Sequence, residues 1–267
     1  MASVFEELRP YAGMTVIPGV TVGQLNYVNQ QDLFSTGCIT TSTAGVVAAN
    51  TRLPLFNAAL FEPAASQGFT AGNMSTGQTN SKFSKGQAPA NQVFIATHCA
   101  FGLFKRSSAD LTVAGTEDLT GMVAAAAGGF AYLNDTYALA QNLSWDLTIG
   151  RGITRTIGTL AEYCSPSVYA KSAQAATVIS DAETPGTGAD LSVNKGLLGS
   201  PTCGMKKLEV PIIFPPLVNV NIEVRSGSPF QTIPLFSALG PAPATAIAQN
   251  ILVRQTLRGY LMTMPVG

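Results

Sequence analysis

Two segments of the chain alternate apolar and polar residues with a period of two. In residues 143–149 the apolar set is Leu143, Trp145, Leu147 and Ile149, with Ser144, Asp146 and Thr148 between them. In residues 218–225 the apolar set is Val218, Val220, Ile222 and Val224, with Asn219, Asn221, Glu223 and Arg225 between them. Because successive side chains of a strand point to opposite faces, this pattern predicts two β-strands that each bury one face.

Three further segments predict strands with a less regular pattern. Residues 93–104 are apolar on both faces, one of which is expected to hold Val93, Ile95, Thr97, Cys99, Phe101 and Leu103. A strand of this kind is covered on both sides or lies at an interface. Residues 208–214 are a short apolar run, and residues 251–264 form a long final strand with a candidate bulge at Gly259. The chain therefore predicts an all-β fold.

Helices are scarce in this sequence. Ser3 and Glu6 have the spacing of a capping box, and Pro10 ends the short amphipathic helix that they begin. This helix either docks on its own domain or forms an arm that docks on a neighbouring molecule or a membrane surface. A second short helix is expected at residues 117–127, between Thr116 as N-cap and a glycine at the C-terminal end.

The predicted domain organisation follows from where the strong strand patterns begin. Residues 1–90 are rich in turns and predict an N-terminal arm with an extended, loop-rich extension, which holds candidate strands at 15–28, 38–43 and 46–56. Residues 91–267 hold the strongest patterns and predict a β-sandwich. Residues 67–87 and 165–205 are polar stretches without periodicity, and both predict loops.

The charge content adds information about the surface. Only 11% of the 267 residues are charged, 15 acidic and 15 basic, whereas an ordinary soluble domain has about 25%. So few charges predict a surface that is covered by neighbouring subunits or by lipid. The balanced charge and the lack of a basic tail argue against direct, sequence-specific nucleic-acid binding. The 46% of hydrophobic residues exclude a disordered chain.

Residues for catalytic chemistry are sparse. His98 is the only histidine, and Cys99 beside it points to the opposite strand face, so the two cannot form a catalytic pair. Ser192 and Lys195 fit S-x-x-K, but the other motifs of penicillin-recognising enzymes are missing. No C-x-x-C spacing occurs, which argues against zinc and redox motifs. For Cys38, Cys99, Cys164 and Cys203 we favour buried free thiols over a disulfide. We therefore predict no enzyme activity and no catalytic, cofactor-binding or metal-binding residues.

Three arginines of the late strands are candidate contact residues. Arg225, Arg254 and Arg258 are expected on strand faces opposite the most apolar ones. They either pair with carboxylates of an adjoining subunit or are exposed charges of a strand face. The sequence leaves both alternatives open.

Five segments share the spacing and strand character of one architecture, namely residues 89–98, 117–127, 143–150, 208–224 and 251–262. Together they resemble the jelly-roll major capsid proteins of tailless icosahedral bacteriophages, from an early strand and its following helix to the closing strand. The resemblance implies a jelly-roll β-sandwich. A single roll is favoured over a double one, because about ten to twelve candidate strands fall short of the roughly sixteen that two rolls need.

The resemblance implies a structural virion protein, a major capsid subunit that self-assembles into an icosahedral shell. Its partners would be further copies of the chain, in trimers or pentamers, with minor capsid proteins and, in phages that enclose one, an internal membrane. It would be made and assembled in the host cytoplasm and reside in the virion capsid. The alternative is a lectin-like or receptor-binding β-sandwich module with its ligand site in residues 67–87 or 165–205.

Overall fold

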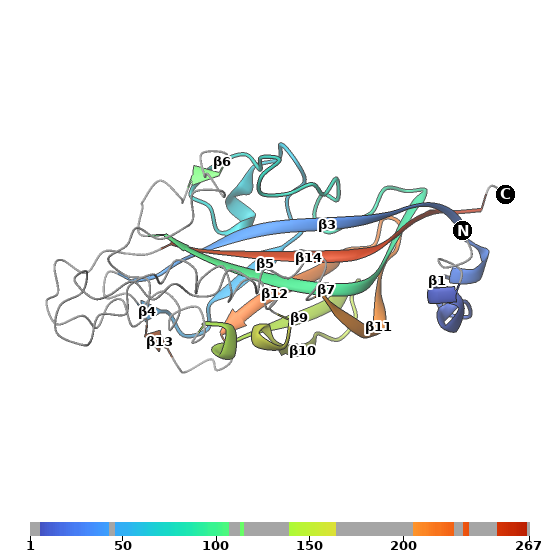
Figure 1. Cartoon of the computed structure of the whole chain (residues 1–267). Helices are drawn as coiled ribbons and strands as arrows, with labels where there is room; N and C mark the ends of the chain where they lie inside the picture. The colour runs from blue at the N-terminus through green and yellow to red at the C-terminus, as the bar shows by residue number, and fades with distance from the viewer. Residues whose placement is uncertain are drawn as a thin grey trace, which may run out of the picture.

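The computed structural model describes residues 6–42, 46–106, 113–114, 139–163, 205–226, 232–234 and 250–265 of the chain. Within them, two four-stranded antiparallel sheets pack against each other (Figure 1). Sheet 1 contains, in spatial order, β11 (Lys206–Phe214), β7 (Gln92–Arg106), β14 (Asn250–Thr263) and β3 (Asn26–Thr40). Sheet 2 contains β10 (Arg155–Thr159), β9 (Leu143–Ile149), β12 (Val220–Ser226) and β5 (Arg52–Leu55).

The strands nearest the two ends of the sequence pair with each other, and the pairing continues toward the middle of the sequence. β3 pairs with β14, β5 with β12, β7 with β11, and β9 with β10, all antiparallel. The chain therefore follows the path of one long antiparallel hairpin, whose four strand pairs alternate between sheet 1 and sheet 2. Pairing of β14 with β7 and of β12 with β9 joins these pairs into the two sheets.

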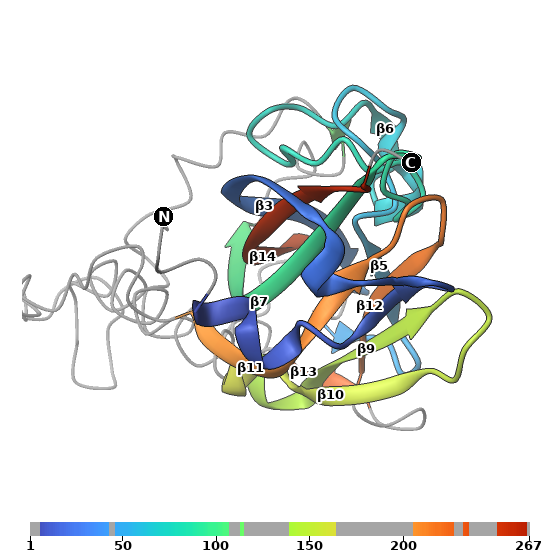
Figure 2. The ribbon, with the colours of Figure 1, turned by 90° about the vertical axis from the view of Figure 1, so that its right-hand side faces the viewer.

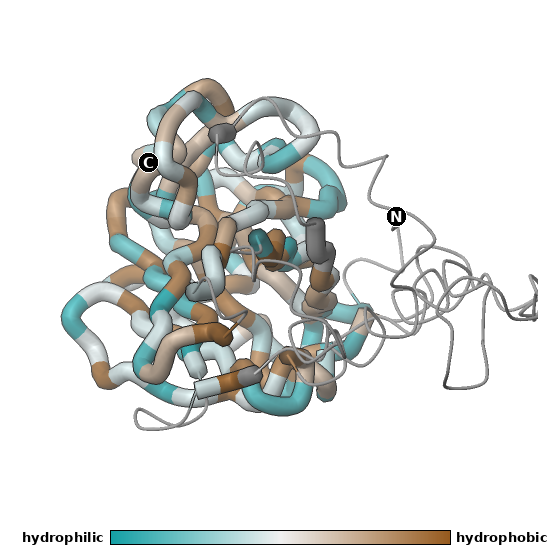
Figure 3. Tube along the Cα trace, turned by 90° about the vertical axis from the view of Figure 1, so that its left-hand side faces the viewer, coloured by the Kyte–Doolittle hydropathy of each residue, from teal (hydrophilic) through white to brown (hydrophobic). Residues whose placement is uncertain are grey.

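The main core lies between the sheets. Trp145 of β9 is fully buried there, with its ring centroid 5.6 Å from that of Phe101 on β7 and 5.3 Å from that of Tyr163. Further along the sandwich, the rings of Phe94 and Phe214 lie 5.9 Å apart. Figure 3, which views the molecule from one end, shows hydrophobic and hydrophilic segments interspersed over the coloured part of the trace. These contacts confirm the all-β sandwich that the sequence predicts.

Short elements flank the two sheets. Those before residue 50 are η1 (Arg9–Tyr11), β1 (Thr15–Ile17), β2 (Val20–Thr21), η2 (Val22–Gln24) and β4 (Val46–Val47). The later ones are η3 (Ala64–Gln67), β6 (Ala71–Gly72), β8 (Val113–Ala114), η6 (Leu160–Glu162) and β13 (Ile233–Pro234). β1 pairs with β2, β4 with β13, and β6 with β8.

The five strongest strand predictions are confirmed, as β7, β9, β11, β12 and β14. Residues 67–87 contain, apart from the end of η3 and the two-residue strand β6, no regular element. The helix expected at residues 117–127 lies outside the described residues. Of the loop expected at residues 165–205, only Met205 is described.

The first 90 residues contribute strands to both sheets. β3 forms an edge of sheet 1 and β5 forms an edge of sheet 2, although the sequence places both regions in an extension that precedes the sandwich. The reason is hydrogen bonding over a long distance in the chain, because β3 pairs along its whole length with the final strand β14. Its inward side chains, Leu33 and Ile39, belong to the main core.

A β-bulge changes which residues of β7 face the core. Gly259 of β14 lies opposite Ala96, and the register then skips Thr97. The core-facing residues of β7 are therefore Phe94 and Ala96 before the bulge, and Cys99, Phe101 and Leu103 after it. Val93 and Ile95, which strict alternation assigns to the face of Cys99, belong instead to a second cluster on the outer face of sheet 1. The bulge expected at Gly259 is confirmed, whereas the predicted single face of residues 93–103 is wrong.

The outer face of sheet 1 is covered at both ends. At one end the N-terminal segment (residues 6–25), which lies over β7 and β11 in Figure 2, buries Leu8, Val16, Val22 and Leu25 against Val93, Ile95, Ile213, Tyr260 and Met262. At the other end the β5–β7 connection buries Ala58, Ala64, Phe69 and Met74 against Cys38 and Leu252. A strip of charged and polar side chains remains between the two clusters.

Candidate functional site

The N-terminal segment is docked on its own subunit. Residues 6–8 are helical and continue into η1, with Pro10 in its first turn. Leu8 is buried in the outer cluster, and the hydroxyl of Tyr11 donates a hydrogen bond to the carbonyl of Glu209, 3.3 Å away. Of the two alternatives for this helix, the described part therefore supports docking on its own domain. Ser3, its expected cap, lies outside the described residues.

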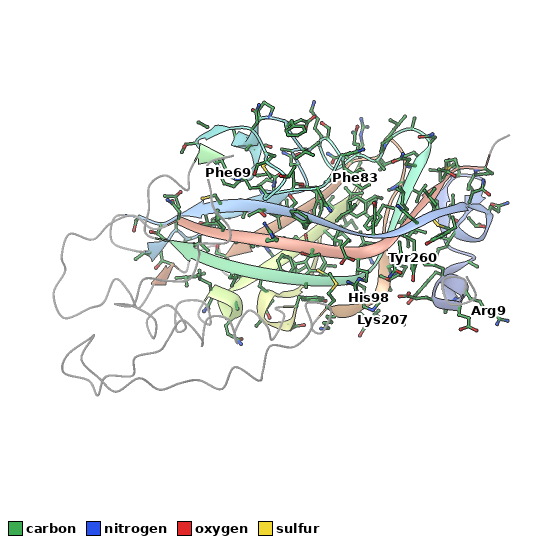
Figure 4. The ribbon with its side chains drawn as sticks, turned by 45° about the horizontal axis from the view of Figure 1, so that its top comes forward. Arg9, Phe69, Phe83, His98, Lys207 and Tyr260 are labelled. Atoms are coloured by element: carbon green, nitrogen blue, oxygen red, sulfur yellow. The ribbon has the colours of Figure 1, made fainter. Side chains whose placement is uncertain are left out.

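Glu7 connects this segment to the only histidine. One carboxylate oxygen of Glu7 accepts a hydrogen bond from the hydroxyl of Tyr260, and the other lies 3.6 Å from Nδ1 of His98. The Oγ1 of Thr97 lies 3.0 Å from the same nitrogen. About a quarter of each side chain of the ion pair is exposed, 27% for His98 and 24% for Glu7. Figure 4 shows His98, Tyr260 and Lys207 at the end of sheet 1 that faces this segment.

Burial and neighbouring groups shift the pKa values of several side chains in this cluster. Burial lowers the pKa of His98, Arg258 and Lys207 lower it further, and Glu7 and Asp32 act in the opposite direction. Hydrogen bonds from Arg258 to both carboxylate oxygens of Asp32, each 2.8 Å long, raise the pKa of the guanidinium. The pKa of Tyr260 is raised, first by burial and then by its hydrogen bond to Glu7. Because the pKa of His98 lies below its ordinary value of 6.5, its imidazole is neutral at neutral pH.

This arrangement fastens the N-terminal segment to sheet 1. Cys99 points into the main core, where Nε2 of Gln255 donates to its sulfur over 3.3 Å, so the structure confirms that it faces away from His98. Tyr260 and Glu7 were not candidates from sequence, because nothing in their local pattern marks them. In the part of the chain that the structure describes, no three His, Cys, Asp or Glu residues come together as a metal-ion site.

The three candidate arginines find partners within their own chain. Nε of Arg225 lies 2.8 Å from a carboxylate oxygen of Asp146, and Arg258 pairs with Asp32 as above. Arg254 donates to Oγ1 of Thr36 at 3.1 Å and to the carbonyl of Gly77, and its guanidinium lies over the ring of Phe34. Burial lowers the pKa of Arg254 to about 10. These side chains stabilise the subunit itself.

The remaining candidate residues are partly described. Cys38 and Cys99 are buried, as the sequence predicts. Cys164, Ser192, Lys195 and Cys203 lie outside the described residues.

Two exposed apolar side chains lie on strained backbone. Phe61 is 70% exposed and has a φ of 69°, and Leu217 is 66% exposed and has a φ of 58°. Each is the third residue of a β-turn, a position where positive φ favours Gly or Asn. Left-handed backbone costs an ordinary residue roughly 1–2 kcal/mol, and neither side chain offsets this by burial within the subunit. The signal in the sequence was Pro215-Pro216 before a residue that is neither Gly nor Asn.

Comparisons with known proteins give no relative from which a function could be taken. No protein-family model, no curated protein sequence and no solved structure matches this chain. Within the described part of the chain, none of the helices has the length and apolar character needed to cross a lipid bilayer.

Proposed function

We propose that this chain is a major capsid subunit, a structural virion protein that folds as a single jelly roll and self-assembles into an icosahedral shell. Its partners are further copies of itself, in trimers or pentamers, and minor capsid proteins of the same particle. It acts by forming contacts and not by catalysis, and its place is the virion capsid after assembly in the host cytoplasm.

The observation that carries this proposal is the strand order. A jelly roll has eight strands in two sheets connected as Greek keys, and it is a fold of viral capsid and lectin domains. If the eight strands of the two sheets are numbered in chain order, sheet 1 reads 6-3-8-1 and sheet 2 reads 5-4-7-2. The first strand thus pairs with the eighth, the second with the seventh, the third with the sixth and the fourth with the fifth, as in a long hairpin rolled into two sheets.

The charge content supports the same proposal. Subunits of a closed shell contact several neighbours, and such obligate contacts are poorer in charge than ordinary surface. Only 11% of this chain is charged, and several of those charges are used within the subunit, including Arg225 with Asp146 and Arg258 with Asp32. Few charges therefore remain to solubilise an isolated subunit.

The lectin-like alternative shares the fold but has less support. Its described candidate loop, residues 67–87, is tied to sheet 1 and does not form an open rim. Gln67 donates to Oγ of Ser35 and to the carbonyl of Thr36, and Asn80 donates to the carbonyl of Asp32. These contacts fasten the loop along the edge of β3. They use polar groups that a ligand site would need for binding its ligand.

Sedimentation velocity and negative-stain microscopy of the purified full chain test the proposal. We expect capsomers or closed shells at micromolar concentration in physiological salt. A monodisperse monomer under these conditions would overturn the proposal. Retention of that monomer on a glycan array would favour the lectin-like alternative instead.

A further inference from the structure

We propose that the turn at residues 215–218 docks onto the turn at residues 59–62 of a second copy of this chain. The two turns present Leu217 and Phe61, so the contact joins different surfaces of the two copies. This inference rests on the proposed self-assembly and names one of its contacts.

The 215–218 turn holds Leu217 outward on a fixed backbone. The amide of Val218 donates to the carbonyl of Pro215 at 3.5 Å, and the amide of Leu217 donates to the carbonyl of Ala88 at 3.0 Å. The two prolines at the start of the turn restrict it further. Leu217 therefore needs no ordering of its backbone before it makes a contact.

A neighbouring turn extends this apolar surface. The amide of Gly150, which follows β9, donates to the carbonyl of Asn219 at 2.7 Å, so the β9–β10 and β11–β12 turns lie side by side. Ile153 is 84% exposed there and Ile149 is 39% exposed. The exposed charges of the β9–β10 turn are cationic, namely Arg151 and Arg155.

The 59–62 turn has matching properties. The amide of Glu62 donates to the carbonyl of Ala59 at 3.0 Å, and the carboxylate of Glu62 accepts from the amide of Ala59 at 2.8 Å. Two hydrogen bonds between Ala59 and Glu62 thus close the turn, and Phe61, which lies within it, is held outward. Glu62 places an acidic group next to the apolar ring, whereas the Leu217 surface is flanked by cations.

The two turns follow neighbouring parts of the core but present different surfaces. The ring of Phe56, three residues before the 59–62 turn, lies 6.2 Å from that of Phe214, which directly precedes the 215–218 turn. Within one subunit the side chains of Phe61 and Leu217 nevertheless stay 70% and 66% exposed, so each is available to a second copy. A contact between unlike surfaces is heterologous, and it builds rings or larger assemblies when repeated from copy to copy.

The strained backbone makes the inference testable without risk to folding. Because Asn tolerates positive φ, Leu217→Asn and Phe61→Asn should each raise the melting temperature of the subunit, by about 2–4 °C. Each should also weaken assembly at least tenfold in sedimentation velocity. Val210→Asn is the matched control, since Val210 is 65% exposed but has no positive φ, and it should leave assembly unchanged.

Mixing the two variants tests the pairing itself. Leu217→Asn subunits keep Phe61 and Phe61→Asn subunits keep Leu217, so an equimolar mixture can form one intact contact and should give dimers that neither variant forms alone. Wild-type assembly with no loss in either variant would overturn this inference and leave the proposed function standing. A wild-type chain that stays monomeric would overturn the proposed function itself.

Discussion

The carboxylate of Glu7 accepts a hydrogen bond from the hydroxyl of Tyr260, although 253 positions separate the two residues along the chain. The bond joins the N-terminal segment to the last strand of sheet 1. Next to it, Leu8 is buried against Met262 and its neighbours in the outer cluster. The N-terminal segment is therefore part of the fold of its own subunit.

Removing this hydrogen bond should destabilise the subunit. Tyr260 is buried, and Tyr260→Phe would leave the Glu7 carboxylate without its donor. Hydrogen bonds to charged groups contribute about 1.5–3 kcal/mol, so we expect a loss of that size in urea denaturation. Tyr11→Phe is the control, because its bond to Glu209 is exposed, and it should change stability by less than about 0.5 kcal/mol. Equal effects of the two variants would contradict this role of Glu7.

Stability should depend on pH through His98. Its pKa in the folded chain lies below the ordinary value of 6.5, chiefly because of burial, so the unfolded chain binds the proton more readily. This contribution to stability is complete above about pH 6.5 and is lost as the pH falls from there through the folded pKa. Thermal unfolding between pH 7.5 and 5 should show the decline, and His98→Gln should flatten it.

The same variant separates this role from assembly. Because the contacts of His98 with Glu7 and Thr97 lie within one subunit, His98→Gln should assemble like the wild type at pH 7.5. An unchanged pH slope in the variant would contradict this role of His98.

The bulge at Gly259 requires glycine for space. A Cβ at this position would lie 2.0 Å from the carbonyl oxygen of Ile95 and 2.7 Å from Cα of Ala96, both rigid backbone atoms of β7. We expect Gly259→Ala to cost about 3 kcal/mol, at the upper end of overpacking effects. Gly13→Ala is the control, because nothing lies within 4 Å of its added methyl group. Urea midpoints measure both, and a tolerated Gly259→Ala would contradict this register.

The sequence was sufficient for strands with a clear pattern of their own. β9 and β12 alternate because sheet 2 buries one face, and β7 has apolar residues on both sides because part of the outer face of sheet 1 is also covered. Even there the pattern missed the switch of faces at Thr97. A bulge adds one residue without any change in composition, and only the pairing with β14 reveals it.

β3 shows where local pattern fails. Its first residues, 26–30, are exposed and mostly polar, and its later residues alternate between the main core at Ile39 and the covered outer face at Cys38. No single period results, so the sequence predicts two fragments in an extension. The cluster around His98 could not be predicted for a similar reason. His98 stands out as the only histidine, but Glu7 and Tyr260, which complete the cluster, come from the two ends of the chain.

Sheet 2 offers a test of a buried ion pair against an exposed one. The side chain of Asp146 is only 7% exposed, and Arg225 holds it at 2.8 Å while donating to Oγ1 of Thr156. Arg225→Leu leaves a buried carboxylate unpaired, which should cost about 3–5 kcal/mol in urea denaturation. Arg52, on the same sheet, pairs with Glu223 at 3.4 Å and is 58% exposed, so Arg52→Leu should cost less than about 1 kcal/mol.

The double variant separates charge burial from loss of packing. Replacing Asp146 with Leu and Arg225 with Met removes both charges and keeps apolar volume at both positions, so it should recover most of the stability that Arg225→Leu loses. If Arg225→Leu loses no more than Arg52→Leu, the carboxylate of Asp146 is not buried as the structure places it. If the double variant is no more stable than Arg225→Leu, packing by the arginine stem and its bond to Thr156 account for the loss.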